Sequence, residues 1–154
     1  MRIVLQRVSQ AQVTVADRIT GAIEQGLVAL VAVAADDDEA TCRMMADKLC
    51  HLRIFPDEDD LMNRSLIDCG GGVLAISQFT LYAECRKGRR PFFGNAAKGP
   101  TAGELFDCFV TCVNELGINC QTGVFGAHMD VSLVNSGPVT IILDSVELSG
   151  PRRR

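Results

Sequence analysis

Two short segments that lie far apart in the chain combine polar groups with glycine or proline at the ends of apolar runs. The first is Ser77–Leu81, which ends one apolar run, and the second is Asn135–Thr140, which separates two others. Strand ends and the loops that follow them commonly carry binding and catalytic groups. We therefore expect these two segments to build one site from two strand ends.

The chemistry of the first segment does not follow the usual nucleophile pattern. A nucleophilic Ser, Thr or Cys needs a base within hydrogen-bond reach, most often histidine. Thr80 is the candidate nucleophile, but strand threonines usually serve packing, and no neighbour in the sequence would activate it. His51 falls within a helical pattern, and His128 precedes a strand. Backbone N–H groups at Gln78 and Phe79 would instead polarise the carbonyl of a reactive ester.

The second segment has two readings. Gly137-Pro138 is typical of a turn between two strands. The same pair would also leave two carbonyls accessible, and a cis bond is conceivable because X–Pro bonds lose most of the usual trans preference. Parallel carbonyls on a rigid turn would accept an α-ammonium group and block one side of the α-carbon.

A cluster of basic residues occupies a long loop between residues 82 and 99: Arg86, Lys87, Arg89 and Arg90. Such a cluster is either a solvated loop or a phosphate-binding surface. The whole chain has 15 basic and 19 acidic residues and a formal charge of −4, which argues against coating of nucleic acid by bulk electrostatics. Any RNA contact is therefore expected to be local. Phe79, Phe125 and Met129 would either stack on an adenine or belong to the core.

Composition indicates one domain spanning residues 1–154, because 47% of 154 residues are apolar and supply a sizeable core. The N-terminal residues lack the apolar core of a signal peptide, and no apolar run reaches membrane-spanning length. We therefore expect a cytoplasmic protein with no membrane association. Seven cysteines form an odd set without a CxxC pair, so neither disulfides nor a metal site is expected, although Cys108 and Cys112 are four residues apart.

The element pattern predicts an α+β fold. Residues Arg2 to Ala34 predict three strands in an antiparallel meander. The acidic run 36–39 predicts a helix N-terminus, and the apolar residues 73–76 predict a strand after a glycine turn.

The second half predicts one helix and two strands. A helix is expected to begin at Pro100, with Thr101 and Glu104 as a capping box, and strands 129–134 and 139–143 are expected to be separated by Gly137-Pro138. The order βββ-α-β-α-ββ predicts mostly antiparallel β-sheets forming a barrel-like core with two covering helices. The residues Arg152–Arg154 are expected to form only a short basic tail.

The two segments resemble the signature motifs of the D-aminoacyl-tRNA deacylases, enzymes that remove D-amino acids wrongly attached to tRNA. The resemblance runs nearly end to end and includes Gln6–Val8, Val13–Val15, Leu52–Phe55, Ser77–Arg90, Phe125–Met129 and Val131–Thr140. The departures are mild, with Ser136 at a variable position and Phe92–Gly94 after the basic loop. These departures bear on loop contacts to tRNA and leave the expected fold and chemistry unchanged.

The resemblance implies a homodimer in which a cis Gly137-Pro138 segment reaches into the active site of the partner. It implies that the strand end Ser77–Thr80 holds the ester, with backbone amides serving the carbonyl. Arg7 resembles the arginine that steadies the glycine-proline turn. The remaining residues that the resemblance assigns to substrate binding are Asn135 and Thr140 of the second motif, and Ala102, Phe125 and Met129 around the terminal adenosine.

The activity implied is cofactor-free hydrolysis of the ester between a D-amino acid, or glycine, and the 3′-terminal adenosine of tRNA. Two alternatives stay open at this point. One is a deacylase with relaxed stereospecificity, which uses a trans glycine-proline turn, although Ser77 favours the D-specific group. The other is a non-catalytic RNA-binding protein whose basic loop docks nucleic acid.

Overall fold

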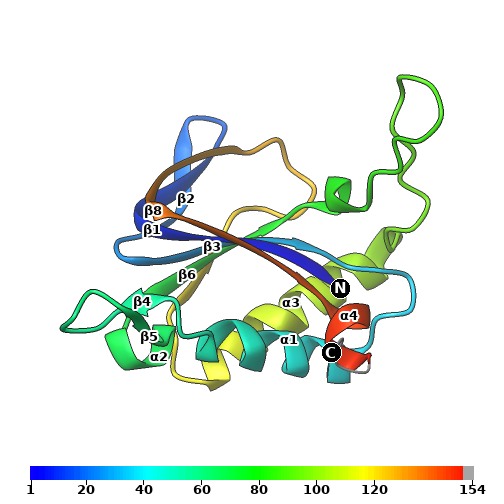
Figure 1. Ribbon diagram of the computed structural model, residues 1–154. Helices are drawn as coiled ribbons and strands as arrows, with labels where there is room; N and C mark the ends of the chain where they lie inside the picture. The colour runs from blue at the N-terminus through cyan, green and yellow to red at the C-terminus, as the bar shows by residue number, and fades with distance from the viewer. Residues whose placement is uncertain (151–154) are drawn as a thin grey trace.

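The structure is a computed structural model that describes residues 1–150, so the tail Arg152–Arg154 lies outside the described residues. Within that range the chain forms a six-stranded mixed sheet that curls around itself, with helices packed along one side (Figure 1). The predicted α+β class, with a barrel-like sheet and two covering helices, is confirmed. The strands of this sheet are β1 (Arg2–Val15), β2 (Arg18–Ile23), β3 (Gly26–Ala32), β6 (Gly72–Ser77), β7 (Cys120–Thr122) and β8 (Asp130–Asp144).

The long first strand organises the sheet. β1 pairs antiparallel with β2, β3 and β8, whereas β3 pairs parallel with β6, and β6 pairs parallel with β7. Parallel neighbours require a crossover connection, and the helices α1 (Glu39–His51) and α3 (Gly99–Glu115) provide these two crossovers. The sheet is therefore mixed, and its parallel part brings the C-terminal ends of β3 and β6 to the same edge.

Two apolar clusters lie on the two faces of this sheet. The larger one packs Ile3, Leu5 and neighbouring strand residues against α1 and α3, with Leu49 and Phe109 fully buried. The smaller one contains Val8, Val28 and other strand residues inside the curl. Alternation of side chains along each strand produces both clusters from the same strands.

Local sequence signals predicted the start of one long helix correctly and the start of the other wrongly. The acidic run does cap α1, because the side chain of Asp38 accepts a hydrogen bond from the backbone N–H of Thr41 at 2.8 Å. The predicted capping box of the second long helix is wrong. α3 begins at Gly99 after Lys98, and Thr101 and Glu104 lie inside the helix, because Pro100 is accommodated within the first turn, where its missing N–H leaves no bond unmade.

Several short elements were not predicted. They are β4 (Phe55–Pro56), β5 (Met62–Arg64), α2 (Leu66–Cys69), the 3₁₀ turn η1 (Phe79–Tyr82) and α4 (Ser145–Ser149). The predicted break at Gly137-Pro138 is only partly correct, because β8 is continuous from Asp130 to Asp144. Its ladder with β1 jumps from the pair Val8–Asn135 to the pair Gln6–Thr140, so residues 136–139 bulge out opposite Arg7. Within residues 1–150, no helix is long and apolar enough to cross a membrane.

Candidate active site

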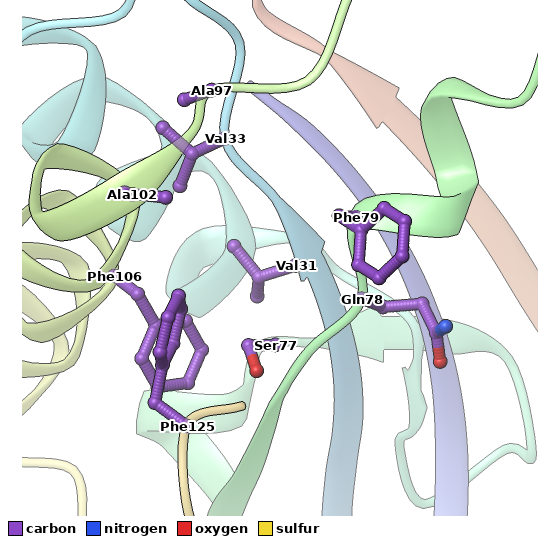
Figure 2. Close-up of a pocket in the computed structure, with 10 residues that line it drawn as sticks. Val31, Val33, Ser77, Gln78, Phe79, Ala97, Ala102, Phe106 and Phe125 are labelled. Carbon is purple, nitrogen blue, oxygen red and sulfur yellow. The ribbon is translucent and has the colours of Figure 1, made fainter. Parts of the chain in front are cut away.

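An apolar cavity of about 410 Å³ opens at the edge where β3 and β6 end (Figure 2). Parallel pairing places Val31 of β3 opposite Ser77 of β6, and the first turns of α3 form the facing wall. This volume falls in the range of small-molecule sites. The lining residues are Val31, Val33, Ser77, Gln78, Phe79, Ala97, Gly99, Ala102, Phe106 and Phe125.

Three of the four residues of the predicted catalytic strand end Ser77–Thr80 line this cavity, and their backbone amides are not equivalent. The N–H of Gln78 donates to the carbonyl oxygen of Val31 at 2.8 Å, so it is already used by the fold. This corrects the expectation that both amides serve an ester. Phe79 opens the turn η1, and the first N–H groups of a helical turn have no partner within the turn. Phe79 N–H is therefore the donor that remains at the cavity edge.

Thr80 lies outside the cavity lining and is exposed. Its hydroxyl accepts a hydrogen bond from Nε2 of Gln78 at 2.5 Å. In Figure 2 the Gln78 side chain extends away from Phe125, on the side of the strand end opposite to the α3 wall. Neither His51 nor His128 lines the cavity. The bond between Gln78 and Thr80 thus orients the strand end. Neither histidine is placed at the cavity to act as a base for a nucleophile among these residues.

The residues expected around the terminal adenosine divide into two groups. Ala102 and Phe125 line the cavity, and the ring of Phe125 packs against Phe106 with 6.1 Å between the ring centroids. Met129 does not line it, because its side chain packs over Gly123 and against the smaller apolar cluster. Two of the three residues therefore lie at the cavity, and Phe125 keeps 48% of its surface exposed.

The second motif forms a separate, tightly bonded cluster with Arg7. The side chain of Asn135 donates to the Thr140 hydroxyl at 3.1 Å and accepts from the Val139 N–H at 2.8 Å, which closes the bulge. Arg7 donates from Nε to the carbonyl oxygen of Ser136 at 2.9 Å. It also donates from Nη1 to the carbonyl oxygen of Ile54 at 2.5 Å. Arg7 therefore ties the bulge to the loop that follows α1.

The centre of this cluster is the Gly137-Pro138 peptide bond, which is cis, as the resemblance implied. Gly137 has a φ of +133°, a region that favours glycine, and a Cβ at this position would lie 2.8 Å from Nη2 of Arg7. Gln6 also belongs to the cluster, since its Nε2 donates to the Thr140 hydroxyl at 3.1 Å. The sequence analysis included Gln6 in the resemblance but assigned a role only to its neighbour Arg7.

The two motifs do not meet within one chain. None of the residues 135–140 lines the cavity next to Ser77. The expectation of one site built from both segments is therefore wrong for a single chain, because the β1–β8 ladder holds the bulge on another part of the sheet. Val31, Val33, Ala97, Gly99 and Phe106 were also missed as lining residues. The apolar run that ends at Val33 was the one signal that could have pointed to two of them.

The basic loop is a hairpin-like projection that extends away from the sheet (Figure 1). Glu84 and Phe92 exchange two backbone hydrogen bonds of 2.7 and 2.9 Å at its base. Arg86 bonds the carboxylate of Glu84, and this contact lowers the pKa of Glu84 to about 2. The three basic side chains left for other partners are exposed, namely Lys87, Arg89 and Arg90.

The cysteines are distributed through the fold without forming a bridge. All seven, which lie within the described residues 42–120, are free thiols. Burial raises the pKa of Cys42 to about 12, which keeps this thiol protonated and poorly nucleophilic. No group of three potential metal ligands occurs within residues 1–150.

Comparison with known proteins connects this geometry to one family. The model of the D-Tyr-tRNA(Tyr) deacylase family matches residues 4–144. A D-aminoacyl-tRNA deacylase of Thermus aquaticus is 53% identical over 152 residues, covering 99% of this chain and 100% of the relative. A D-aminoacyl-tRNA deacylase of Thermomicrobium roseum is 57% identical over 150 residues, covering 97% of each chain.

Two solved structures share the fold of this chain. The structure of a c-Myc DNA unwinding element binding protein superposes with a TM-score of 0.86 at 34% identity, covering 94% of this chain and 98% of the other. The structure of a probable eukaryotic D-amino acid tRNA deacylase superposes with a TM-score of 0.81 at 20% identity, covering 92% and 97%. At 20% identity, the likeness to this second structure concerns the fold alone.

Proposed function

This chain belongs to the D-Tyr-tRNA(Tyr) deacylase family, and we propose that it hydrolyses the ester between a D-amino acid and the 3′-terminal adenosine of tRNA. Relatives that are more than half identical over almost the whole chain carry the name D-aminoacyl-tRNA deacylase. The observation that carries the proposal is the apolar cavity that ends beside the Phe79 N–H. It offers an aromatic surface for a base and, at its edge, a fixed donor for a carbonyl.

Backbone electrostatics and the substrate itself supply the chemistry of the proposed reaction. The adenine lies against Phe125 and Ala102, since aromatic side chains commonly stack on unpaired bases. The ester carbonyl accepts a hydrogen bond from Phe79 N–H, which stabilises the oxyanion that forms when water attacks. The α-ammonium group and the vicinal ribose hydroxyl already make this ester reactive. Gln78 and Thr80 hold the strand end, so neither hydroxyl nor thiol of the protein needs to attack.

Chiral selection is assigned to the turn of a second protomer. We infer a homodimer in which Gly137-Pro138 of one chain reaches the cavity of its partner, where turn carbonyls accept the α-ammonium group and exclude an L side chain. The turn is available for this contact because it bulges from β8 outside its own cavity. The face that would meet the partner carries Ile142, which is 66% exposed, beside its cross-strand neighbour Val4. Glycine has no side chain to exclude, so glycyl-tRNA is also a substrate.

The hairpin with Lys87, Arg89 and Arg90 is assigned to the tRNA phosphates, since its exposed basic side chains cluster in a chain that is acidic as a whole. Arg86 contributes less than the other three while it is paired with Glu84. No metal or cofactor is required for the proposed reaction. Residues 1–154 act as one deacylase domain, and the substrate class places the activity in the cytoplasm.

The test compares deacylation of D-tyrosyl-tRNA, L-tyrosyl-tRNA and glycyl-tRNA by the purified protein in the presence of a metal chelator. Rapid loss of the D-tyrosyl and glycyl esters with a stable L-tyrosyl ester is the expected result. Equal loss of both tyrosyl esters would identify a deacylase of relaxed stereospecificity. Loss of none of the esters, together with binding of tRNA, would identify a non-catalytic RNA-binding protein.

A further inference from the structure

The turn η1, which presents Phe79 N–H at the cavity edge, is not held by core packing. None of the residues Phe79–Tyr82 is buried, and Phe79 itself is 57% exposed. Local backbone bonds close the turn, with Leu81 N–H donating to the Gln78 carbonyl at 3.2 Å. Such bonds fix the shape of a turn but not its position on the protein. The Gln78 N–H bond to the Val31 carbonyl ties the start of η1 to β3, so a separate contact is needed to hold its second half.

Arg2 makes that contact from the first residue of β1. Its Nη1 donates to the carbonyl oxygen of Leu81 at 3.0 Å. Its guanidinium also lies over the ring of Tyr82, 4.9 Å from the ring centroid. Both contacts fall in the second half of η1, on residues that do not line the cavity. Arg2 thus holds the half of the turn that does not line the cavity.

The Arg2 guanidinium is itself held in place by a carboxylate of the sheet. Its Nε donates to Oδ2 of Asp144 at 2.9 Å, and that carboxylate is only 11% exposed. The other carboxylate oxygen, Oδ1, caps α4 by accepting from the Val146 N–H at 3.0 Å. The backbone of Arg2 pairs with Ala32 of β3 and with Asp144 of β8. A planar guanidinium with several donors can join three such partners at once, whereas a lysine cannot.

We propose that Arg2 is a positioning residue that locks η1 to the sheet, so that Phe79 N–H stays aligned for the ester carbonyl. This role rests on the proposed deacylase function. A donor that stabilises an oxyanion works only when it is fixed before the reaction begins. Because Arg2 touches no part of the cavity, its loss should affect the chemical step more than substrate binding.

The experiment measures kcat and KM on D-tyrosyl-tRNA for the parent protein and for Arg2→Ala, Arg2→Lys and Arg43→Ala. Arg43→Ala is the matched control, because it removes an exposed ion pair with Glu115 far along the chain from η1. Arg2→Ala is expected to lower kcat on the order of tenfold with KM nearly unchanged. Arg2→Lys, which keeps a positive charge near Tyr82 but carries all its donors on a single nitrogen, should recover part of the loss. Arg43→Ala should match the parent.

Hydrogen exchange of the segment 78–83 provides a readout that needs no substrate. Faster exchange at the Leu81 and Ala83 amides in Arg2→Ala, with parental rates in Arg43→Ala, is the expected result. A parental kcat with parental exchange in Arg2→Ala would overturn the proposal, as would equal losses in both variants. If Arg2→Ala does not fold, Arg2→Gln, which keeps part of the side-chain stem, is judged by the same two readouts. If the parent itself leaves D-tyrosyl-tRNA intact, the proposed function fails while the exchange comparison still decides the role of Arg2.

Discussion

Substitution of Arg7 by alanine should reduce chiral selection more than any other single change outside the cavity. The Arg7 guanidinium makes the 2.9 Å bond to the Ser136 carbonyl and the 2.5 Å bond to the Ile54 carbonyl. Hydrogen bonds to charged groups contribute about 1.5–3 kcal/mol each. The bond to Ser136 is exposed, so we take the lower limit of about 1.5 kcal/mol, which corresponds to roughly a tenfold change in a rate ratio.

The assay is the ratio of deacylation rates on D-tyrosyl-tRNA and L-tyrosyl-tRNA at equal enzyme concentration. Arg7→Ala should lower this ratio by about tenfold, mainly through faster hydrolysis of the L-ester, because the loosened turn no longer excludes the L side chain. Arg53→Ala is the control, since Arg53 also donates to a backbone carbonyl, that of Asn63 at 2.6 Å, but does not touch the turn. An unchanged ratio in Arg7→Ala, with a lowered melting temperature, would show that the arginine serves stability and not selection.

Three further substitutions test other parts of the proposal. Thr80→Ala should keep deacylation within about fivefold of the parent, since the hydroxyl only orients a neighbour, whereas a fall of about a thousandfold or more would identify a nucleophile. Ile142→Asp should convert a dimer to a monomer in light scattering and remove activity, while Ile19→Asp, at a residue that is also about 60% exposed, should change neither. Glu84→Gln should release Arg86 for phosphate contact and steepen the salt dependence of tRNA binding by about one unit of slope; an unchanged slope would remove Arg86 from the interface.

The predictable part of the fold depended on local patterns that tertiary contacts did not override. The alternation of side chains along Arg2–Val15 reflects strand geometry, and the acidic start of α1 reflects helix capping. Each of these effects can be recognised within a few consecutive residues. The parallel pairing of β3 with β6 was not visible, because it depends on how the crossover through α1 packs against the face of the sheet. The start of α3 was misjudged because Thr101 and Glu104 have capping-box spacing, while Pro100 already occupies the first turn.

Site residues that belong to a short sequence motif could be predicted. Site residues that reach the cavity only through the packing of distant segments could not. Ser77 and Phe125 were singled out and do line the cavity. Val31 was missed because an apolar residue at a strand end looks the same whether it faces the core or a cavity. Met129 was assigned to the pocket, but it lies just before β8, and its side chain packs over Gly123 and against the inner cluster. The separation of Gly137 from the cavity depends on the β1–β8 register, which no local pattern reveals.

The claim that the cavity of one protomer and the turn of its partner form one site is tested most directly by mixing two variants. Ala102→Trp fills the cavity and should be inactive, whereas Arg7→Ala keeps its cavity but has an unselective turn. In a mixed dimer, the intact cavity of the Arg7→Ala chain meets the intact turn of the Ala102→Trp chain. Hydrolysis of L-tyrosyl-tRNA per Arg7→Ala chain should then fall to about half at equal mixing and toward zero in excess, while D-tyrosyl-tRNA hydrolysis persists. An L-tyrosyl rate that is independent of the added Ala102→Trp chain would contradict a shared site.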